Sequence, residues 1–395
     1  MLGHLKVVEL ATMVAAPAAA GLLADWGADV IKIEPHAGDP MRGGGGPLGS
    51  TNFDLHNRGK RSMALSLKSP EARAVILRLV EDADLFVTNM LPGQLAKLEL
   101  DYPNLAPINP RLVYGEISSF GREGPDRDRP ATDNLGFWAR GGGTSLLTLK
   151  GQEPLPIRQS VGDRITGLSA AVGMLAAVLE AMKTGRGRLV DTSLLRSAVW
   201  TFGTDMTNQL TNGRVGSSKG RREQVMPLSN YFKTRDGRWL QIHTTIAQLA
   251  PALDRPELAD DPRWADFRSA RENGTELVDI VDELFAALSY EEVTARLEAA
   301  DVRWEPVQSP ADVVADPQAQ AAGCFTEVPD AQAPEGYVRQ VASPPAFYDG
   351  ETPARTELRP APAVGEHTRQ LLRELGYTDA DIAALADSRV IPGAA

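Results

Sequence analysis

The first third of the chain alternates short apolar runs with longer amphipathic segments. Leu5 to Leu10 has the pattern of a strand, Ala15 to Trp26 that of a helix rich in alanine and leucine, and Asp29 to Glu34 that of a second strand. Gly27 follows the helix, at a position where glycine commonly ends one. This order of strand, helix and strand predicts parallel strands in a sheet that carries helices on its faces.

The same alternation continues to about residue 193. Ser69 and Pro70 are residue types that begin helices, and the helix they start is expected to reach Asp84. The apolar stretch from Asp163 to Lys183 predicts a long helix, and its many small residues favour close packing on a neighbour. Further strands are predicted at Leu85 to Thr88, Leu112 to Ser118 and Leu189 to Ser193.

After residue 200 the character of the sequence changes, which indicates a second domain. Residues 201–225 are polar and basic and are expected to form a linker. From residue 226 two strands flank the turn Arg235 to Gly237, and helices follow to about Ala300. We therefore predict a small domain at 226–330. Residues 1–200 would form most of a large domain, and 331–395 a linker with the C-terminal part of that domain.

Composition and charge narrow the classes of function. The chain has 395 residues, 43% hydrophobic and 24% charged, as expected for a globular protein of a few domains. Its net charge of −11 argues against nucleic acid as a partner, and a polyanionic ligand would need a local basic pocket. The N-terminus has no basic and apolar leader pattern, so we expect a cytoplasmic protein without a membrane partner.

A metal or nicotinamide site is not expected. The single cysteine, Cys324, excludes a cysteine-rich zinc site, and the five histidines are scattered. The run Gly43 to Gly46 lacks the Gly-Lys-Ser/Thr of a phosphate-binding P-loop, and no G-x-G-x-x-G follows the first strand. The glycine run is then either a flexible surface loop or a segment that closes over a ligand.

Two polar features carry candidate chemistry. Four cations lie within twelve residues, so this segment either holds phosphates or is a solvated basic loop: Arg58, Lys60, Arg61 and Lys68. Asp163 begins the long helix, either as an N-cap carboxylate or as a nucleophile or base. These roles conflict, because N–H donors stabilise the anion and lower its basicity. Asp133 has the context of a turn residue, and Glu9 and Glu34 are interpreted as structural.

Several stretches, taken together, resemble the family III CoA-transferases of the CaiB/BaiF type, a superfamily that includes 2-methylacyl-CoA racemases. In family order, from about residue 5 to 370, they are VVELATMVAAPAAAGLLADWGADVIKIEP, NRGKRSMALSLKSPEA, TNMLPGQLAKL, SFGREGPDRDRPATD, VGDRITGLSAAVGMLAA, TGRGRLVDTSLL, RDGRWLQI and VGEHT. The resemblance implies an α/β fold with a Rossmann-like large domain built from both chain ends. It also implies a smaller inserted α/β domain and a homodimer whose subunits interlock as rings.

The resemblance implies the activity as well. Family members move CoA from an acyl-CoA donor to a small carboxylic acid acceptor, without a metal. Asp163 matches the catalytic aspartate, which attacks the thioester to give a mixed anhydride and then an aspartyl-CoA thioester. Coenzyme A would contact Val14, Ala15, Leu65, Lys68, Asn89, Met90, Leu91, Lys97 and Asp133, with Lys68 and Lys97 on its phosphates. Two positions depart from some members, which have glutamine at Val14 and a cation at Pro35.

Alternatives to the transferase remain. A racemase needs an acid and a base on opposite faces of the α-carbon, but Thr132 and Ile246 stand where racemases have histidine and glutamate. A non-catalytic CoA-binding protein and a nicotinamide oxidoreductase are less favoured. The acids are not named by the sequence, and neighbours of the acyl group are expected among Phe137, Trp138, Arg140 and the segment Tyr231 to His243. Arg140 or Arg164 could pair with a second substrate carboxylate.

Overall fold

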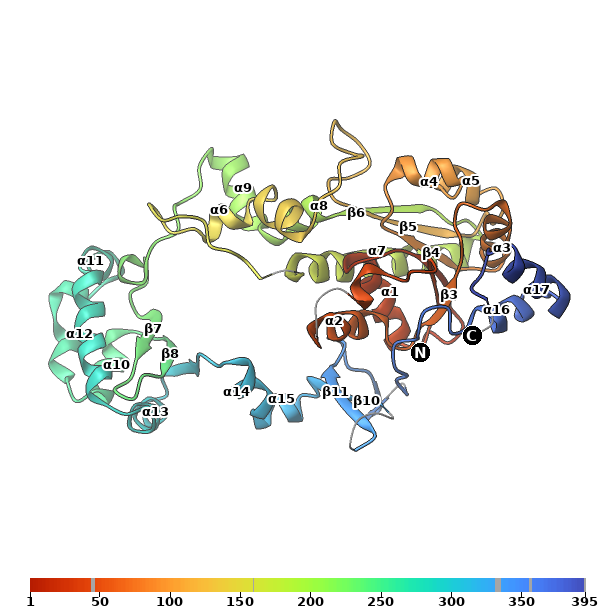
Figure 1. The fold of residues 1–395 in the computed structure, drawn as a ribbon. Helices are drawn as coiled ribbons and strands as arrows, with labels where there is room; N and C mark the ends of the chain where they lie inside the picture. Colours follow the sequence, from red (N-terminus) through yellow and green to blue (C-terminus); the bar gives the residue numbers. More distant parts are fainter. Residues whose placement is uncertain (44–46, 159, 331–334, 355–356, 394–395) are drawn as a thin grey trace. The chain divides into compact units, whose positions relative to one another are not determined.

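A computed structural model describes residues 1–43, 47–158, 160–330, 335–354 and 357–393 (Figure 1). The chain divides into two compact units, and each is described by itself. The larger consists of Met1–Ser145, Pro156–Val215 and Ala322–Ala395, so it contains both ends of the chain. The smaller consists of Leu146–Leu155 and Gly216–Ala321.

The larger unit is built on a six-stranded parallel sheet. Its strands are β1 (Lys6–Leu10), β2 (Asp29–Glu34), β3 (Arg61–Ala64), β4 (Leu85–Thr88), β5 (Val113–Ser118) and β6 (Leu189–Ser193), in the order β3-β2-β1-β4-β5-β6. The predicted strands of this region are confirmed. The chain order reverses between β1 and β4, and ligands of such sheets bind at this point, beyond the carboxyl ends of the strands.

Helices cover both faces of the sheet. One core joins the sheet to α3 (Pro70–Glu81), α4 (Pro92–Leu98), α5 (Tyr102–Leu105), α16 (Thr368–Glu374) and α17 (Asp379–Asp387). The other joins it to α1 (Ala15–Asp25) and α7 (Val161–Thr184). The remaining helices of this part of the chain are α2 (Pro47–Asn57), α6 (Gly143–Leu147), α8 (Leu194–Thr201) and α9 (Gly203–Asn212).

Helix α7 packs closely on the start of α1. A Cβ atom at Gly167 would lie 2.7 Å from the carbonyl oxygen of Ala15, so this crossing requires glycine. The long helix predicted for this stretch is confirmed. It is also the one helix of the described chain that is long and apolar enough to span a bilayer, a test that core helices of soluble proteins pass as well. Of the most apolar 18-residue stretch of this helix, 44% is buried within the chain.

The smaller unit is an antiparallel sheet covered by helices. Strands β7 (Ser229–Lys233), β8 (Trp239–His243) and β9 (Arg303–Pro306) pair in that order, which confirms the predicted hairpin. Its core contains Phe232 and Phe285. The helices are α10 (Ile246–Ala252), α11 (Phe267–Glu272), α12 (Gly274–Ala287), α13 (Tyr290–Ala299), α14 (Pro310–Ala315) and α15 (Pro317–Ala321).

Two connecting regions complete the chain. The segment 201–225, which the sequence predicts to be a linker, contains helix α9. None of the residues of α9 is buried, which explains the polar composition of this helix. After the smaller unit, two hairpins lead back to the C-terminal helices. They are β10 (Phe325–Pro329) with β11 (Tyr337–Val341), and β12 (Tyr348–Asp349) with β13 (Thr352–Pro353).

Candidate active site

The point where the strand order reverses brings two of the predicted CoA-contacting segments together. Val14 ends the turn from β1 to α1 and Ala15 begins α1, and Asn89, Met90 and Leu91 follow β4. The backbone N–H of Thr12 donates to Asn89 Oδ1 at 3.0 Å, and Asn89 Nδ2 donates to the Thr12 carbonyl at 2.6 Å. The side chain of Asn89 is therefore engaged in joining the two segments, which lie 77 residues apart at these bonds.

The remaining predicted CoA contacts near the sheet lie on neighbouring segments. Leu65 is buried directly after β3, whereas Lys68 and Lys97 are exposed, and within the described residues neither lysine forms an ion pair. Arg73 at the start of α3 pairs with Glu99 just after α4, at 3.1 Å. This ion pair shows that the two segments carrying the exposed lysines adjoin each other.

Three of the four cations in the basic segment serve the fold instead of a phosphate. Arg58 pairs with Asp25 at 2.6 Å, Lys60 with Glu9 at 2.6 Å, and Arg61 with Asp29 and Glu374. Arg58 and Lys60 are buried. The hypothesis that this segment holds phosphates is wrong for these three, because their charges are already neutralised by carboxylates within the fold. Lys68 is the exposed member of the group.

The N-terminus of α7 is capped by Asp133 and not by Asp163. The carboxylate of Asp133 accepts the backbone N–H of Asp163 at 2.8 Å and that of Ser160 at 3.1 Å. Ser160, the N-cap residue itself, makes no side-chain cap bond. Within the described residues, no hydrogen bond reaches the carboxylate of Asp163. The N-cap role that the sequence allowed for Asp163 is therefore performed by Asp133, 30 positions earlier.

The environment raises the pKa values of both carboxylates. Burial, and then the negative charge of Asp133, raises the pKa of Asp163 to about 7, against the smaller opposing effect of Arg164. Burial also raises the pKa of Asp133, while the backbone N–H groups of Asp163 and Ser160 lower it. Asp163 is thus more basic than an ordinary aspartate and titrates near neutral pH.

Close packing fixes the position of this pair. A Cβ atom at Gly162 would lie 2.2 Å from the Phe137 ring and 2.6 Å from Asp133 Oδ1, so only glycine fits between them. Phe137 and Trp138 pack with Phe202 in a small core cluster. Phe137 is fully buried there, which makes it a support of the α7 terminus and not a wall of an open pocket.

The two arginines considered for substrate binding differ. Arg140 pairs with Asp126 and lies over the Phe120 ring at 4.6 Å, so its charge is already balanced by a carboxylate. Arg164 Nε instead donates to His56 Nε2 at 3.3 Å, and Arg164 Nη2 donates to Asn52 Oδ1 at 3.3 Å.

The histidine that holds Arg164 is neutral. Burial, and then the charge of Arg164, lowers the pKa of His56 to about 3. His56 Nδ1 lies 2.8 Å from the carbonyl oxygen of Asn52, to which it donates, so Nε2 is left as the acceptor. Both groups that hold Arg164 are uncharged. Among the described residues, Arg164 is therefore held by neutral groups and forms no ion pair.

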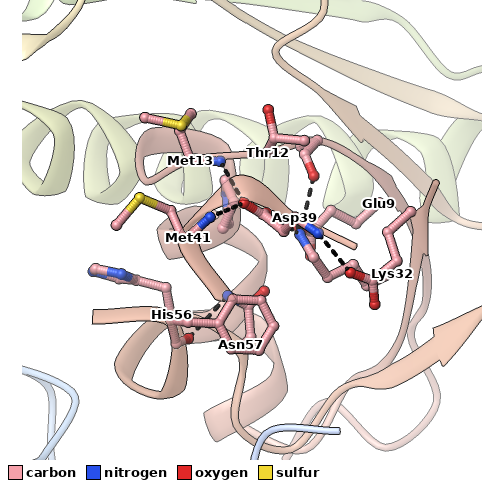
Figure 2. Close-up of polar contacts among 12 residues, drawn as sticks. Glu9, Thr12, Met13, Lys32, Asp39, Met41, His56 and Asn57 are labelled. Atoms are coloured by element: carbon pink, nitrogen blue, oxygen red, sulfur yellow. Dashed lines mark hydrogen bonds and ion pairs between the residues drawn. The ribbon is translucent and has the colours of Figure 1, made fainter. Parts of the chain in front are cut away.

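Below the turn from β1 to α1 lies a buried network of charges (Figure 2). Lys32 pairs with Glu9 at 3.1 Å and with Asp39 at 2.9 Å. Lys60 pairs with the second oxygen of Glu9 at 2.6 Å. The structural interpretation of Glu9 is confirmed, and Glu34 likewise pairs with Arg42 at 2.6 Å. Sequence reasoning missed Lys32 and Asp39. The available signal was not local: Glu9 and Lys32 lie opposite each other in neighbouring parallel strands whose other interior positions are apolar.

The sequence profile of CoA-transferase family III matches residues 2–368. The chain belongs to CoA-transferase family III. The family predicted from the sequence is confirmed.

Relatives with assigned activities match over nearly the whole chain. The (R)-2-hydroxy-4-methylpentanoate CoA-transferase of Clostridioides difficile is 33% identical, over 99% of both proteins. The succinate–glutarate CoA-transferase of Agrobacterium fabrum is 32% identical, over 95% of both. A crystal structure of a CaiB/BaiF family protein from Brucella suis has a TM-score of 0.83 and 31% identity, and the match covers 94% of this chain and 98% of that one. The enzyme class predicted from the sequence agrees with these matches.

The two positions that the resemblance aligned with racemase acid–base groups carry Thr132 and Ile246 in this chain. Thr132 is exposed beside Asp133, and Ile246 is 8% exposed within the core of the smaller unit. Of the glycine run proposed to close over a ligand, residues 44–46 lie outside the described part of the chain. Within the described part, no group of three or more His, Cys, Asp or Glu side chains is arranged to hold a metal.

Proposed function

We propose that this family III CoA-transferase moves CoA from an acyl-CoA donor to a carboxylic acid, with Asp163 as the nucleophile. The observation that carries the proposal is the division of labour between two aspartates. Asp133 accepts the N–H groups at the start of α7, so the Asp163 carboxylate is left without N–H donors and with a pKa raised to about 7. An anion that hydrogen bonds do not stabilise is the better nucleophile.

The first half of the reaction creates the covalent intermediate. A carboxylate oxygen of Asp163 attacks the thioester carbonyl, forms a C–O bond and expels the CoA thiolate as the C–S bond breaks. The thiolate then attacks the Asp163 carbonyl of the mixed anhydride. A C–S bond forms, the anhydride C–O bond breaks, and the donor acid leaves as its carboxylate. The enzyme now holds an aspartyl-CoA thioester.

The second half reverses these steps with a different acid. The acceptor carboxylate attacks the aspartyl thioester and releases the CoA thiolate, which leaves a new anhydride on Asp163. The thiolate attacks the acceptor carbonyl of that anhydride, forms the new acyl-CoA and regenerates the Asp163 carboxylate. Because the thioester free energy is conserved only if water is excluded, a closing segment is part of the proposal. Gly43 to Gly46 and the loop before Tyr231 remain the candidates.

The CoA moiety is proposed to lie across the point where the strand order reverses. Val14 and Ala15 meet Asn89 to Leu91 there through the bonds of Thr12, and the exposed Lys68 and Lys97 on adjoining segments are suited to its phosphates. Ala15 also contacts α7 at Gly167, one turn after Asp163. This contact links the CoA-binding turn to the helix that carries the nucleophile.

The acid specificity is proposed to depend on Arg164. Its guanidinium lies beside Asp163 and is held by the neutral groups of His56 and Asn52. A cation held in this way is suited to a second carboxylate on the substrate acid. Relatives include a glutarate enzyme and a 2-hydroxy-4-methylpentanoate enzyme, so both dicarboxylic and monocarboxylic acids belong in the test. We propose a dicarboxylic acid as one of the two substrates.

A homodimer with interlocked subunits is proposed as the active form. An apolar stripe on the exposed face of α7 supports this part of the proposal. Its members are Leu168, Val172, Leu179 and Met182, of which three are at least 60% exposed. Their spacing places them on one side of the helix, and such a stripe is typical of a surface covered by a partner. Size-exclusion chromatography with light scattering tests it, and a clean monomer would contradict the dimer.

The decisive experiment is intact-protein mass spectrometry after incubation with a panel of acyl-CoAs, with and without hydroxylamine. An aspartyl-CoA adduct, or a hydroxamate at Asp163, is expected for the wild type and not for Asp163→Ala. If neither forms with any donor, the incubation is repeated in deuterated water. Deuterium at the α-carbon of a 2-methylacyl-CoA would then support a racemase instead.

A further inference from the structure

The turn from β1 to α1 is held by side chains from several other segments. Lys32 Nζ donates to the carbonyl of Ala11 at 3.0 Å, and Lys60 Nζ donates to the carbonyl of Pro17 at 3.0 Å. Between these two points, the N–H of Met13 donates to Asp39 Oδ1 at 3.3 Å. The start of the turn, its middle and the first turn of α1 are therefore each bound by a charged side chain.

These side chains depend on one another. Glu9, Lys32, Asp39 and Lys60 are at most 3% exposed. Lys32 lies between the carboxylates of Glu9 and Asp39, and Glu9 lies between the two lysines. The four charges sum to zero. Because a buried charge is tolerated only when it is paired, loss of one member weakens the hold of the others on the turn.

The middle of the turn has an unfavourable backbone conformation. Met13 has φ +70°, in the left-handed region that residues with a Cβ rarely adopt, and its side chain is exposed. Such a conformation persists only where the surroundings enforce it. Figure 2 shows Asp39 between Lys32 on one side and the backbones of Met13 and Met41 on the other. Asp39 Oδ1 also accepts the Met41 N–H at 3.0 Å.

We propose that Glu9, Lys32, Asp39 and Lys60 form a turn clamp that holds Met13 in this conformation and so presents Val14 and Ala15 to CoA. Asp39 is the central positioning residue, because it acts on the turn through Met13. The inference rests on the proposed function, since it assigns the clamped turn to CoA. The clamp also steadies the nucleophile's helix, because Gly167 of α7 lies against the Ala15 carbonyl held within the turn.

The test separates the hydrogen bond to Met13 from the charge of Asp39. Asp39→Ala removes the acceptor, and the KM for acyl-CoA and the Kd for free CoA are expected to rise about tenfold or more, with a smaller change in kcat. Asp39→Asn keeps an oxygen for the Met13 N–H but loses the charge that pairs with Lys32, so its KM is expected to rise less than that of Asp39→Ala. Met13→Gly in the Asp39→Ala background is expected to restore much of the affinity, because glycine adopts φ +70° unaided.

A matched control removes a different buried charge pair from the same unit. Asp25→Asn weakens the Asp25–Arg58 pair at the far end of α1, and is expected to lower the Tm without changing the KM. Should Asp39→Ala not fold, the charge-balanced Lys32→Met/Asp39→Ala variant replaces it, with an increase in KM at least as large. Unfolding of both would overturn the positioning role in favour of a purely structural one.

Hydrogen exchange of the ligand-free proteins gives a readout that does not depend on activity. Faster exchange is expected in Asp39→Ala in the peptide that contains residues 11–17 and around Met41, whose N–H also loses its acceptor, and a smaller increase is expected in Asp39→Asn. If wild type binds CoA and Asp39→Ala binds it equally well, the clamp is wrong while the proposed function stands. If wild type binds no CoA yet the turn exchanges faster in Asp39→Ala, the proposed function fails and the assignment of this turn to CoA fails with it.

Discussion

Two clusters of ionisable side chains in the larger unit contrast in how their charges are balanced. Around Lys32, carboxylates and ammonium groups alternate, and every one of the four charges is paired. At the start of α7, two carboxylates lie close together, and the pKa values of both are raised. The first arrangement holds backbone in place. The second raises the pKa of Asp163, while Asp133 takes the structural role of capping α7. A carboxylate in this situation is suited to act as a nucleophile.

The largest expected effect is the loss of the second cluster's chemistry. Asp163→Ala and Asp163→Asn should reduce CoA transfer by about 10³-fold or more, because the neighbouring Asp133 carboxylate is occupied by the N–H groups at the start of α7 and cannot replace it. Binding of free CoA, measured by calorimetry, should stay within about threefold of wild type. Substantial turnover by purified Asp163→Asn would show that the carboxylate is not the nucleophile.

The same substitution has an opposite effect on stability. The pKa of Asp163 is raised in the folded protein, so its contribution to stability is present at low pH and is lost as pH rises from the ordinary aspartate value to about 7. Asp163→Asn should therefore have a higher Tm than wild type at about pH 8, and a similar Tm at about pH 4. A thermal melt series across this range measures it, and an equal difference at both pH values would contradict the assignment.

Removing a lysine from the first cluster should also lower the stability of the fold. Lys60→Met leaves the buried Glu9 carboxylate with one lysine instead of two, and should lower the free energy of unfolding by about 3–5 kcal/mol. Lys68→Met, at an exposed lysine, is the matched control and should change stability by less than about 0.5 kcal/mol. Equilibrium denaturation in urea compares them. Equal stabilities would mean that the Glu9–Lys60 pair contributes nothing to the fold.

The cation beside the second cluster should affect selectivity more than rate. Arg164→Met should raise the KM for a dicarboxylic acceptor such as glutarate about tenfold, while a monocarboxylic 2-hydroxy acid is affected less than about twofold. Arg140→Met is the control, because Arg140 is already paired with Asp126. Equal losses for both acids would remove Arg164 from acid recognition. Turnover of monocarboxylic acids alone would refute a dicarboxylic substrate but keep the CoA-transferase.

The smallest predicted effect concerns the coupling between the two aspartates. The charge of Asp133 raises the pKa of Asp163, so Asp133→Asn should lower that pKa and move the acid limb of the kcat/KM profile to lower pH. The amide oxygen of asparagine can still accept an N–H at the start of α7. Asp126→Asn, a charge change in the preceding loop, should leave the limb in place. An unshifted limb in Asp133→Asn would mean that burial alone sets the pKa.

The sequence by itself determined the elements and the family. Alternation of apolar runs located β1, α1 and β2, and helix-starting residues located α3, because these signals are local. The ordered family motifs selected Asp163 for the nucleophile. They could not show that its alternative role, the N-cap of α7, belongs to Asp133, because that depends on a loop 30 residues away folding back onto the helix.

Only the tertiary structure decided which charges are free to act. The basic segment contains four cations that the sequence does not distinguish. Three of them, Arg58, Lys60 and Arg61, are paired with carboxylates, whereas Lys68 is exposed. Lys32 and Asp39 gave no local signal, because the value of a buried charge depends on partners that other segments bring to it. Local sequence specifies backbone conformation and burial pattern, but a charge acquires its role from the packing of distant segments around it.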